Sequence, residues 1–160
     1  MSFEESVLLE VMRAVIQVGL DAIVIGNGAA ALQGVPVTTQ DIDFLVRETP
    51  RNEDKIKDLV AVLGENVRSS RPFEPVSRMI RVEGLPVDID FVFGLSSRAK
   101  FESVKSRAHE ITIGDVSIRV ADLQDVIAAK RAAGRPKDLA TLAILQQYLD
   151  VQNGKNEDET

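Results

Sequence analysis

The sequence lacks cysteine and tryptophan, and it contains only one histidine and one tyrosine. The absence of cysteine excludes disulfide bonds, cysteine-ligated zinc and a thiol nucleophile. The single histidine, His109, leaves no pair for a histidine-rich metal site, and its place at the start of a predicted strand is typical of a solvated side chain. Because aromatic residues make up only 4% of the chain, the core has to be built from Val, Leu, Ile and Ala.

Long apolar runs are also missing. No segment approaches the roughly 20 residues that a membrane-spanning helix needs, and the acidic start of the chain lacks the basic and apolar regions of a signal peptide. We therefore expect a cytoplasmic protein without a membrane partner. The net charge of -6 argues against general binding of duplex DNA, because attraction to phosphate dominates that affinity. It leaves the binding of a nucleotide open.

Glycine, proline and the apolar spacing divide the chain into helices and strands. The predicted helices span residues 3–18, 29–33, about 52–63, 123–133 and 136 to about 151. The predicted strands span residues 22–25, 41–46, 76–82, 86–93, 108–113 and 116–120, the last four as two hairpins. Residues 101–106 are left unassigned.

Strands grouped in hairpins, with helices clustered at both ends, indicate an α+β fold. We expect a mixed β-sheet with flanking helices and a C-terminal helix pair, in which Asp122 caps the first helix and Gly134 ends it. One domain covers residues 1–151, and the polar, acidic residues 152–160 are predicted to be disordered.

Two aspartates, Asp41 and Asp43, are set two residues apart in a predicted strand. Side chains of a strand alternate between its faces, so both carboxylates share one face while Ile42, Phe44 and Val46 face the core. Neighbouring carboxylates repel each other, and a hard cation such as Mg²⁺ relieves the repulsion because it prefers carboxylate and phosphate oxygen. The pair indicates a metal site, whereas the competing interpretation is a strand edge with solvated charge.

The pattern recurs at Asp88 and Asp90 on a second apolar strand. If the two strands are neighbours, three or four carboxylates meet at one point, as a two-metal phosphoryl-transfer site requires. The third carboxylate can then act as general base on an incoming hydroxyl group. Two copies of the motif in a short chain favour a site over solvated charge. The sequence does not choose between Asp88 and Asp90 as the third carboxylate.

A glycine turn, Gly26-Asn27-Gly28, lies between the first strand and a short helix. Glycines let the backbone approach a phosphate, and the free N–H groups at a helix start attract it, although a tight turn without a ligand looks the same. The turn and Ala31 also fit the dinucleotide-binding fingerprint. In that fingerprint the next acidic residue closes its strand, whereas Asp41 and Asp43 open theirs.

Together, residues 25–32 (IGNGAAAL) and 39–46 (TQDIDFLV) resemble the nucleotidyltransferase superfamily. Its signature is a Gly-Gly or Gly-Ser turn that opens a helix, then an Asp-x-Asp strand, then a third acid on a later strand. Residues 130–139 (KRAAGRPKDL) are similar to the C-terminal segment of minimal members, which include the nucleotidyltransferase toxins of toxin–antitoxin and abortive-infection systems. The resemblance covers most of residues 20–145.

The resemblance implies catalytic and metal-binding roles for the four aspartates, with Mg²⁺ or Mn²⁺ as the metal. It also implies that Gly26 and Asn27 hold the triphosphate of an NTP. Asn27 stands where glycine or serine is usual, but asparagine tolerates left-handed backbone and can donate to an oxyanion.

A basic segment contains Lys130, Arg135 and Lys137. Gly134 and Pro136 within it fit the end of one helix and the start of the next. The three cations are candidates for binding the triphosphate or an RNA acceptor, although cations are also ordinary on a solvated helix.

We therefore predict an enzyme of the EC 2.7.7 type that transfers a nucleoside monophosphate from an NTP to a hydroxyl group of RNA, protein or a small molecule. As a toxin–antitoxin component it would have an antitoxin partner. The first alternative is a catalytically silent binding protein with the same fold, because of Asn27 and because no acceptor-binding domain is evident. A dinucleotide-binding domain is the second alternative.

Overall fold

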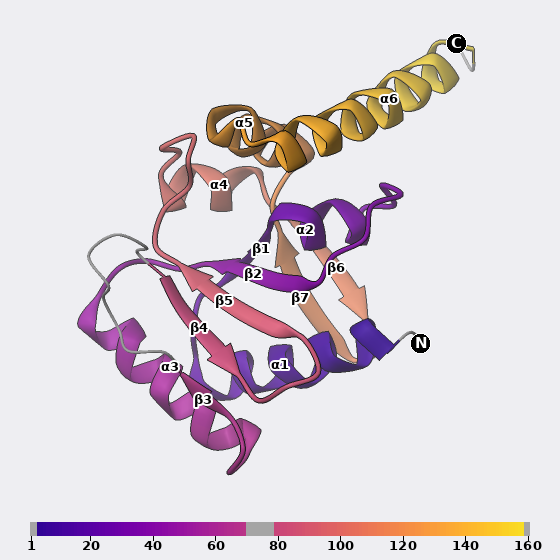
Figure 1. Cartoon of the computed structure of the whole chain (residues 1–160). Coiled ribbons are helices and arrows are strands. Elements are labelled where there is room, and N and C mark those ends of the chain that lie inside the picture. Colours follow the sequence, from indigo (N-terminus) through magenta and orange to yellow (C-terminus); the bar gives the residue numbers. More distant parts are fainter. Residues whose placement is uncertain (1–2, 70–78, 159–160) are drawn as a thin grey trace.

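The computed structural model describes residues 3–69 and 79–158 of the chain (Figure 1). The helices in these ranges are α1 Phe3–Val18, α2 Gly26–Leu32, α3 Pro50–Leu63, α4 Phe101–Arg107, α5 Leu123–Ala133 and α6 Pro136–Asp158. The strands are β1 Ile23–Ile25, β2 Asp41–Leu45, β3 Arg68–Ser69, β4 Met79–Glu83, β5 Asp88–Val92, β6 His109–Ile113 and β7 Val116–Val120. None of the helices in this part of the chain has both the length and the apolar character to cross a membrane.

The strands of the described residues form one mixed sheet in the order β3-β4-β5-β2-β1-β7-β6. In its centre, β1 runs antiparallel to β2 and parallel to β7, and β2 runs parallel to β5. The hairpins β4–β5 and β6–β7 extend the sheet on either side, and β3 pairs with β4 at one edge. The mixed sheet confirms the predicted α+β class. The antiparallel β1–β2 pair contradicts a dinucleotide-binding domain, which is built from parallel βαβ units.

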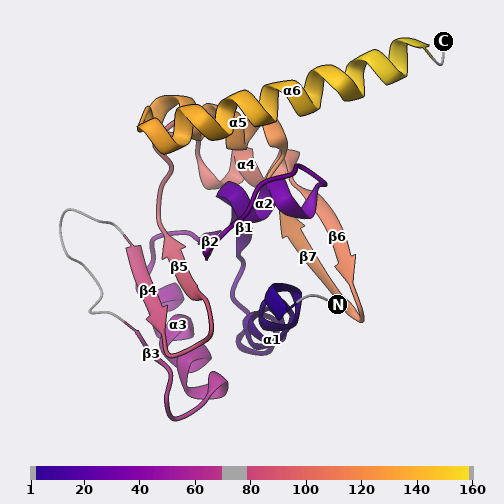
Figure 2. The ribbon, with the colours of Figure 1, turned by 45° about the vertical axis from the view of Figure 1, so that its right-hand side comes forward.

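The helices gather in two groups (Figures 1 and 2). α1 packs against α3, and α1 also contacts β7. α2 begins directly after β1 and packs against α5, which in turn packs against α6. The second group therefore stands beside the end of the sheet where β1 ends and β2 begins.

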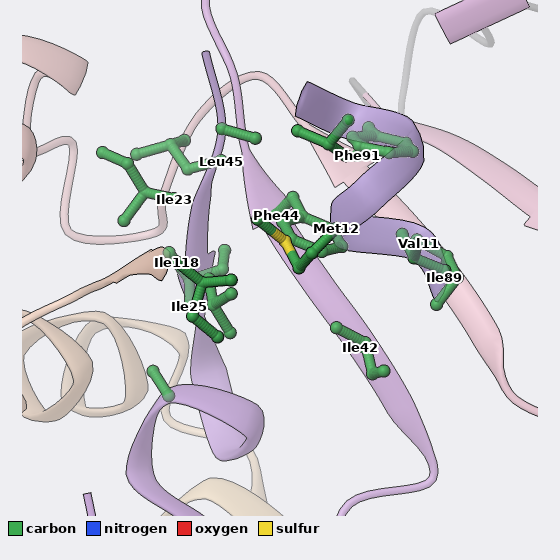
Figure 3. Packing of buried hydrophobic residues seen from close by; sticks show 14 of the residues in the cluster. Val11, Met12, Ile23, Ile25, Ile42, Phe44, Leu45, Ile89, Phe91 and Ile118 are labelled. Carbon is green, nitrogen blue, oxygen red and sulfur yellow. The ribbon is translucent and has the colours of Figure 1, made fainter. Parts of the chain in front are cut away.

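The core lies against the apolar side chains of the central strands. Phe44 of β2 and Phe91 of β5 are fully buried, and their rings stack with centroids 5.3 Å apart. Figure 3 shows them among the buried side chains of the core, which include Val11 and Met12 of α1. Because side chains alternate along a strand, the aspartates that precede these phenylalanines point to the opposite face of the sheet.

Several predicted element boundaries are confirmed. The carboxylate of Asp122 accepts a hydrogen bond from the backbone N–H of Gln124 at the start of α5, and Gly134 ends α5 in the left-handed conformation with φ 64°. The unassigned residues 101–106 form most of α4. The beginning of the strand predicted at 76–82 falls on residues 76–78, which lie outside the described residues.

Helix α6 is longer than the sequence predicted. It continues to Asp158, so the expectation of disorder is corrected for residues 152–158, and residues 159–160 lie outside the described residues. The polar residues after Val151 include no proline, and one glycine costs a helix only about 1 kcal/mol, so nothing local ends it. The last turns of α6 project away from the rest of the chain in both views (Figures 1 and 2).

Candidate active site

The strand register places four residues in one row across the sheet. Arg81 of β4 lies opposite Asp90 of β5, Asp90 lies opposite Asp43 of β2, and Asp43 lies opposite Ile25 of β1. Partners in adjacent strands share a face, so the row brings a cation and two carboxylates together. It ends at the residue that precedes the glycine turn, because Gly26 follows Ile25.

A second pair of carboxylates lies beside this row. Asp41 of β2 is the register partner of Asp88 of β5, two residues before Asp43 and Asp90. The condition set by the sequence, that the two Asp-Ile-Asp strands be neighbours, is therefore met: the four aspartates form two adjacent pairs on one face. Their catalytic and metal-binding roles remain predictions.

Asp43 is the carboxyl group most affected by its surroundings. Burial, the charges of Asp90 and Asp41, and a side-chain hydrogen bond with Asp90 together raise the pKa of Asp43 from its ordinary value to about 6. The positive charge of Lys130 acts in the opposite direction and lowers the pKa of Asp43. Without another cation, the site therefore retains a proton on Asp43 below about pH 6.

Asp90 is held by Arg81, a residue that sequence reasoning missed. The Nε of Arg81 donates to Oδ1 of Asp90 at 2.8 Å, and Nη2 donates to Oδ2 at 2.9 Å. The side chain of Asp90 is 6% exposed, whereas that of Asp88 is 44% exposed and lies 3.8 Å from Nη1 of the same arginine. An arginine in the middle of the apolar segment Met79-Ile80-Arg81-Val82 was the available signal.

A cavity of about 450 Å³ opens beside Asp41 and Asp43. Its lining contains most of the predicted site residues, namely Gly26, Asn27, Asp41, Asp43, Lys130, Arg135 and Lys137. It also contains Gly94, Leu95 and Ser96 after β5, and Thr141 of α6, which the sequence did not indicate. Asp88 and Asp90 are not part of this lining, so the cavity is bordered by the carboxylates of β2.

The glycine turn approaches Asp43 closely. Gly26 has φ +64°, and a Cβ atom at this position would lie 3.3 Å from Oδ2 of Asp43. A larger residue would therefore be strained in its backbone and crowded against the carboxylate.

The side chain of Asn27 contacts the segment that precedes β2. Its Nδ2 donates to the backbone carbonyl of Thr38 at 3.3 Å. Its Oδ1 is buried and has no hydrogen-bond partner within the described parts of the chain. Because Nδ2 carries two N–H donors, the amide of Asn27 and the backbone N–H groups of the turn both stay candidates for binding a phosphate.

The three predicted cations differ in their partners. Arg135 donates through Nε to Oδ2 of the buried Asp138 at 2.6 Å, which offsets its charge. Lys130 is half-buried; burial lowers its pKa, the neighbouring Asp138 and Asp43 raise it, and Arg135 and Lys137 lower it further. Lys130 is therefore the cation whose charge lowers the pKa of Asp43. An anion that enters the cavity would favour the charged form of Lys130.

The donor set suits a hard divalent cation. Among residues 3–69 and 79–158, no three His, Cys, Asp or Glu side chains are gathered closely enough to form a complete metal site. Mg²⁺, however, is usually bound by one or two carboxylates together with substrate phosphates and water. Asp41 and Asp43 supply such carboxylates at the wall of a cavity that also contains lysines. The residues present therefore fit Mg²⁺ or Mn²⁺ bound together with a polyphosphate.

Comparison with known proteins agrees with this geometry. Residues 4–159 match the protein family described as "Nucleotidyl transferase of unknown function". No curated protein is similar enough in sequence to count as a match.

The fold is also found in solved structures. The solution structure of the antibiotic-resistance factor ANT(2'')-Ia has a TM-score of 0.65 at 16% identity, and the match covers 91% of this chain and 84% of that chain. The crystal structure of ANT(2'')-Ia in complex with adenylyl-2''-tobramycin gives 0.64 at 15% identity, covering 95% and 92%. TM1012 of Thermotoga maritima, assigned as a nucleotidyltransferase, gives 0.63 at 20% identity, covering 94% and 96%. At these identities the likeness shows a shared fold.

Proposed function

Since the chain belongs to a family of nucleotidyl transferases whose function is unknown, we propose that it transfers a nucleoside monophosphate from an NTP to a hydroxyl group. The observation that carries the proposal is the pairing of Asp41 with Asp88 and of Asp43 with Asp90, beside a cavity bordered by the glycine turn and Lys130. Paired carboxylates next to a phosphate-sized cavity are what metal-assisted phosphoryl transfer requires.

In this reaction the hydroxyl oxygen of the acceptor attacks the α-phosphorus of the NTP. A new P–O bond forms while the bond from the α-phosphorus to the oxygen bridging it to the β-phosphate breaks, and pyrophosphate leaves with that oxygen. The proton of the hydroxyl passes to a carboxylate of β5 acting as general base, Asp88 or Asp90, and from there to solvent. Asp41 and Asp43 would hold Mg²⁺ or Mn²⁺, which would supply positive charge to neutralise the triphosphate.

The residues that line the cavity would bind different parts of the NTP or hold the site in place. The backbone at Gly26 and Asn27 would approach the phosphates, and Lys130 of α5 and Lys137 of α6 would supply cationic side chains. Arg135, already paired with Asp138, positions the turn between α5 and α6 and contributes less charge to a ligand.

The proposed reaction requires an acceptor that carries a hydroxyl group. ANT(2'')-Ia, which shares the fold, was crystallised with adenylyl-2''-tobramycin, and this favours a small-molecule hydroxyl among the acceptors. RNA and protein hydroxyls are the other acceptor classes. We further propose that the protein works in the cytoplasm, where an antitoxin would be its partner if it is part of a toxin–antitoxin system.

The Asp43→Asn variant tests the proposal. We expect isothermal titration of the wild type to show NTP binding that requires Mg²⁺, and the variant to lose at least about tenfold in affinity for the metal–nucleotide complex, because a carboxylate ligand is removed. The matched control is Asp58→Asn on the exposed side of α3, which removes the same charge far from the cavity and should bind as the wild type does. Equal affinities for all three proteins would contradict the proposal.

A second function is favoured by Asn27, whose amide is engaged with Thr38. A catalytically silent member of the family would bind the nucleotide without turnover. Incubation with radiolabelled NTPs and pooled RNA, protein and aminoglycoside acceptors distinguishes the two, because only the enzyme releases pyrophosphate.

Replacing Lys130 by Met should weaken NTP binding by about tenfold, because a charged contact to phosphate contributes roughly 1.5 kcal/mol. Methionine keeps an unbranched side chain, one atom shorter than lysine, and removes the charge. The control is Lys57→Met on the exposed face of α3, and titration calorimetry measures both variants. If Lys130→Met binds NTP as tightly as Lys57→Met does, Lys130 has no role in binding the triphosphate.

A further inference from the structure

The cavity beside Asp43 extends past this residue in both directions along β2. At one end, Asn27 of the glycine turn donates to the backbone carbonyl of Thr38, in the segment that leads into β2. At the other end, the lining contains Val92, which pairs with the last residue of β2, and residues 94–96 of the loop that follows β5. If the glycine turn holds the phosphates of an NTP, the second end is left for the nucleoside or for another reactant.

The loop after β5 belongs to one of two basic segments around this cavity. Residues 94–107 and 129–141 both contribute to the lining, and each contains four Lys or Arg and one Asp or Glu. Figures 1 and 2 show the loop rising from β5 toward α5. Because the whole chain has a net charge of -6, positive charge is concentrated at the cavity, which is typical of a site for anions.

Most of these cations are not neutralised within the protein. Three of the eight form ion pairs, namely Lys105–Asp21, Arg107–Asp125 and Arg135–Asp138. The other five have no carboxylate partner among residues 3–69 and 79–158, and they are Arg98, Lys100, Lys130, Arg131 and Lys137. Lys130 and Lys137 line the cavity and serve the triphosphate in the proposed function. Arg98 and Lys100 of the loop therefore remain available for a second anion.

The loop that carries these two cations is held in place. It enters α4, which the ion pairs of Lys105 and Arg107 tie to neighbouring elements. Within the loop, the backbone N–H of Arg98 donates to the carbonyl of Leu95 at 2.9 Å. Among the described residues, Arg98 is the one non-glycine residue with a positive φ, 62°, a conformation that is uncommon for such residues and concentrated at ligand sites. The loop therefore presents Arg98 and Lys100 in a defined turn.

A phosphate group suits these two side chains better than other occupants of the second end do. The base and ribose of an NTP carry no negative charge at neutral pH, and Arg98 and Lys100 would repel a cationic acceptor. An arginine binds phosphate through two parallel hydrogen bonds, and a lysine adds a point charge. The second anion is therefore best assigned to the other reactant, the acceptor.

We propose that Arg98 and Lys100 bind a phosphate group of the acceptor, so that the protein modifies a hydroxyl group of a phosphate-bearing molecule. This inference rests on the proposed function, because it names the class of acceptor for the same reaction. The acceptor's own phosphate neither gains nor loses a bond, and the attacking hydroxyl group lies elsewhere in the same molecule. A phosphorylated small molecule and the end of an RNA strand share this chemistry.

Two probes distinguish these sources, each added to the full chain saturated with Mg²⁺ and a non-hydrolysable NTP analogue. Glycerol 3-phosphate represents the small molecule, and calorimetry should show that it binds at least about tenfold more tightly than glycerol. A fluorescein-labelled single-stranded RNA, followed by anisotropy, represents the strand. Binding of the RNA alone identifies a nucleic-acid acceptor, and binding of glycerol 3-phosphate identifies a small phosphorylated one. Binding of neither probe overturns the proposal.

The double variant Arg98→Met/Lys100→Met should bind the probe that the wild type binds about tenfold more weakly or worse. Its affinity for NTP should stay within about twofold of the wild type. The matched control, Arg51→Met/Lys57→Met, removes two exposed cations from α3 and should bind as the wild type does. With RNA, the slope of log affinity against log salt should also fall by about 0.7 for each lost phosphate contact. Equal affinities of the two double variants for the probe overturn the proposal.

Arg98→Gly carries the test should the double variant fail to fold, because glycine suits the left-handed backbone at this position. We expect it to bind the probe about tenfold more weakly, whereas Arg98→Lys keeps the charge and should lose less. Wild-type affinity in Arg98→Gly overturns the assignment of Arg98. A wild-type protein that binds NTP with Mg²⁺ but neither probe overturns this inference alone, whereas one that binds no NTP with Mg²⁺ overturns the proposed function as well.

Discussion

An Asp43→Asn variant of the metal-free protein should have a higher free energy of unfolding than the wild type at pH 8, by about 1–3 kcal/mol. The reason is that the wild type then carries an ionised Asp43 that is partly buried and adjacent to Asp90 and Asp41, and the same surroundings raise its pKa to about 6. Asparagine has nearly the same shape, carries no charge, and can donate a hydrogen bond to Asp90.

The stability difference between Asp43→Asn and the wild type should depend on pH. The pKa of Asp43 in the folded protein, about 6, is above its value near 4 in the unfolded chain, so the folded protein holds the proton more tightly. The stabilisation by that proton is fully present below about pH 4 and is lost as the pH rises through 6. The advantage of Asp43→Asn should therefore be small at pH 4 and reach its full size above pH 7.

Urea denaturation at pH 4, 6 and 8 measures the difference, with Asp58→Asn on α3 as the control for an exposed charge. Mg²⁺ with NTP should stabilise the wild type at pH 8 and leave Asp43→Asn unaffected, because the metal needs the ionised carboxylate. An Asp43→Asn variant less stable than the wild type at pH 8 would show that Asp43 carries a structural ion pair rather than a destabilising charge.

Replacing Phe91 by Ala should reduce the free energy of unfolding by about 3–5 kcal/mol. Phe91 is fully buried and stacks on Phe44, so the change creates a cavity and removes the aromatic contact between β2 and β5. Phe91→Leu keeps most of the volume and should lose only about 1 kcal/mol.

Guanidinium denaturation measures both changes. The exposed Val62 of α3 provides the control, because Val62→Ala removes apolar atoms that already face solvent and should change stability by less than about 0.5 kcal/mol. A loss in Phe91→Ala no larger than that in Phe91→Leu would mean that the core closes over the missing ring.

Local features of the site were predictable from the sequence because they depend on neighbours in the chain. Alternation along β2 and β5 placed each aspartate pair on one face, and Gly26 marked a turn that only glycine makes easily. The cap at Asp122 and the stop at Gly134 also follow from short-range rules, and both are confirmed.

The remaining features depend on contacts between distant parts of the chain. That β2 lies beside β5, in a register that pairs Asp43 with Asp90, is decided by the whole sheet and not by either strand. Arg81 becomes the partner of Asp90 only through the register of the β4–β5 hairpin. The length of α6 was underestimated because polar residues without proline favour neither helix nor disorder strongly.

The stacked rings of Phe44 and Phe91 have a consequence for how reliably the strands align. Sliding β5 by two residues along β2 would keep apolar side chains on one face and polar ones on the other, so alternation alone does not reject that misalignment. It would, however, set Asp43 opposite Asp88, and Phe44 opposite Ile89 in place of Phe91. The aromatic pair makes the native alignment the one of lower energy, and a weakened stack would therefore produce a misaligned fraction in which Asp90 faces Leu45.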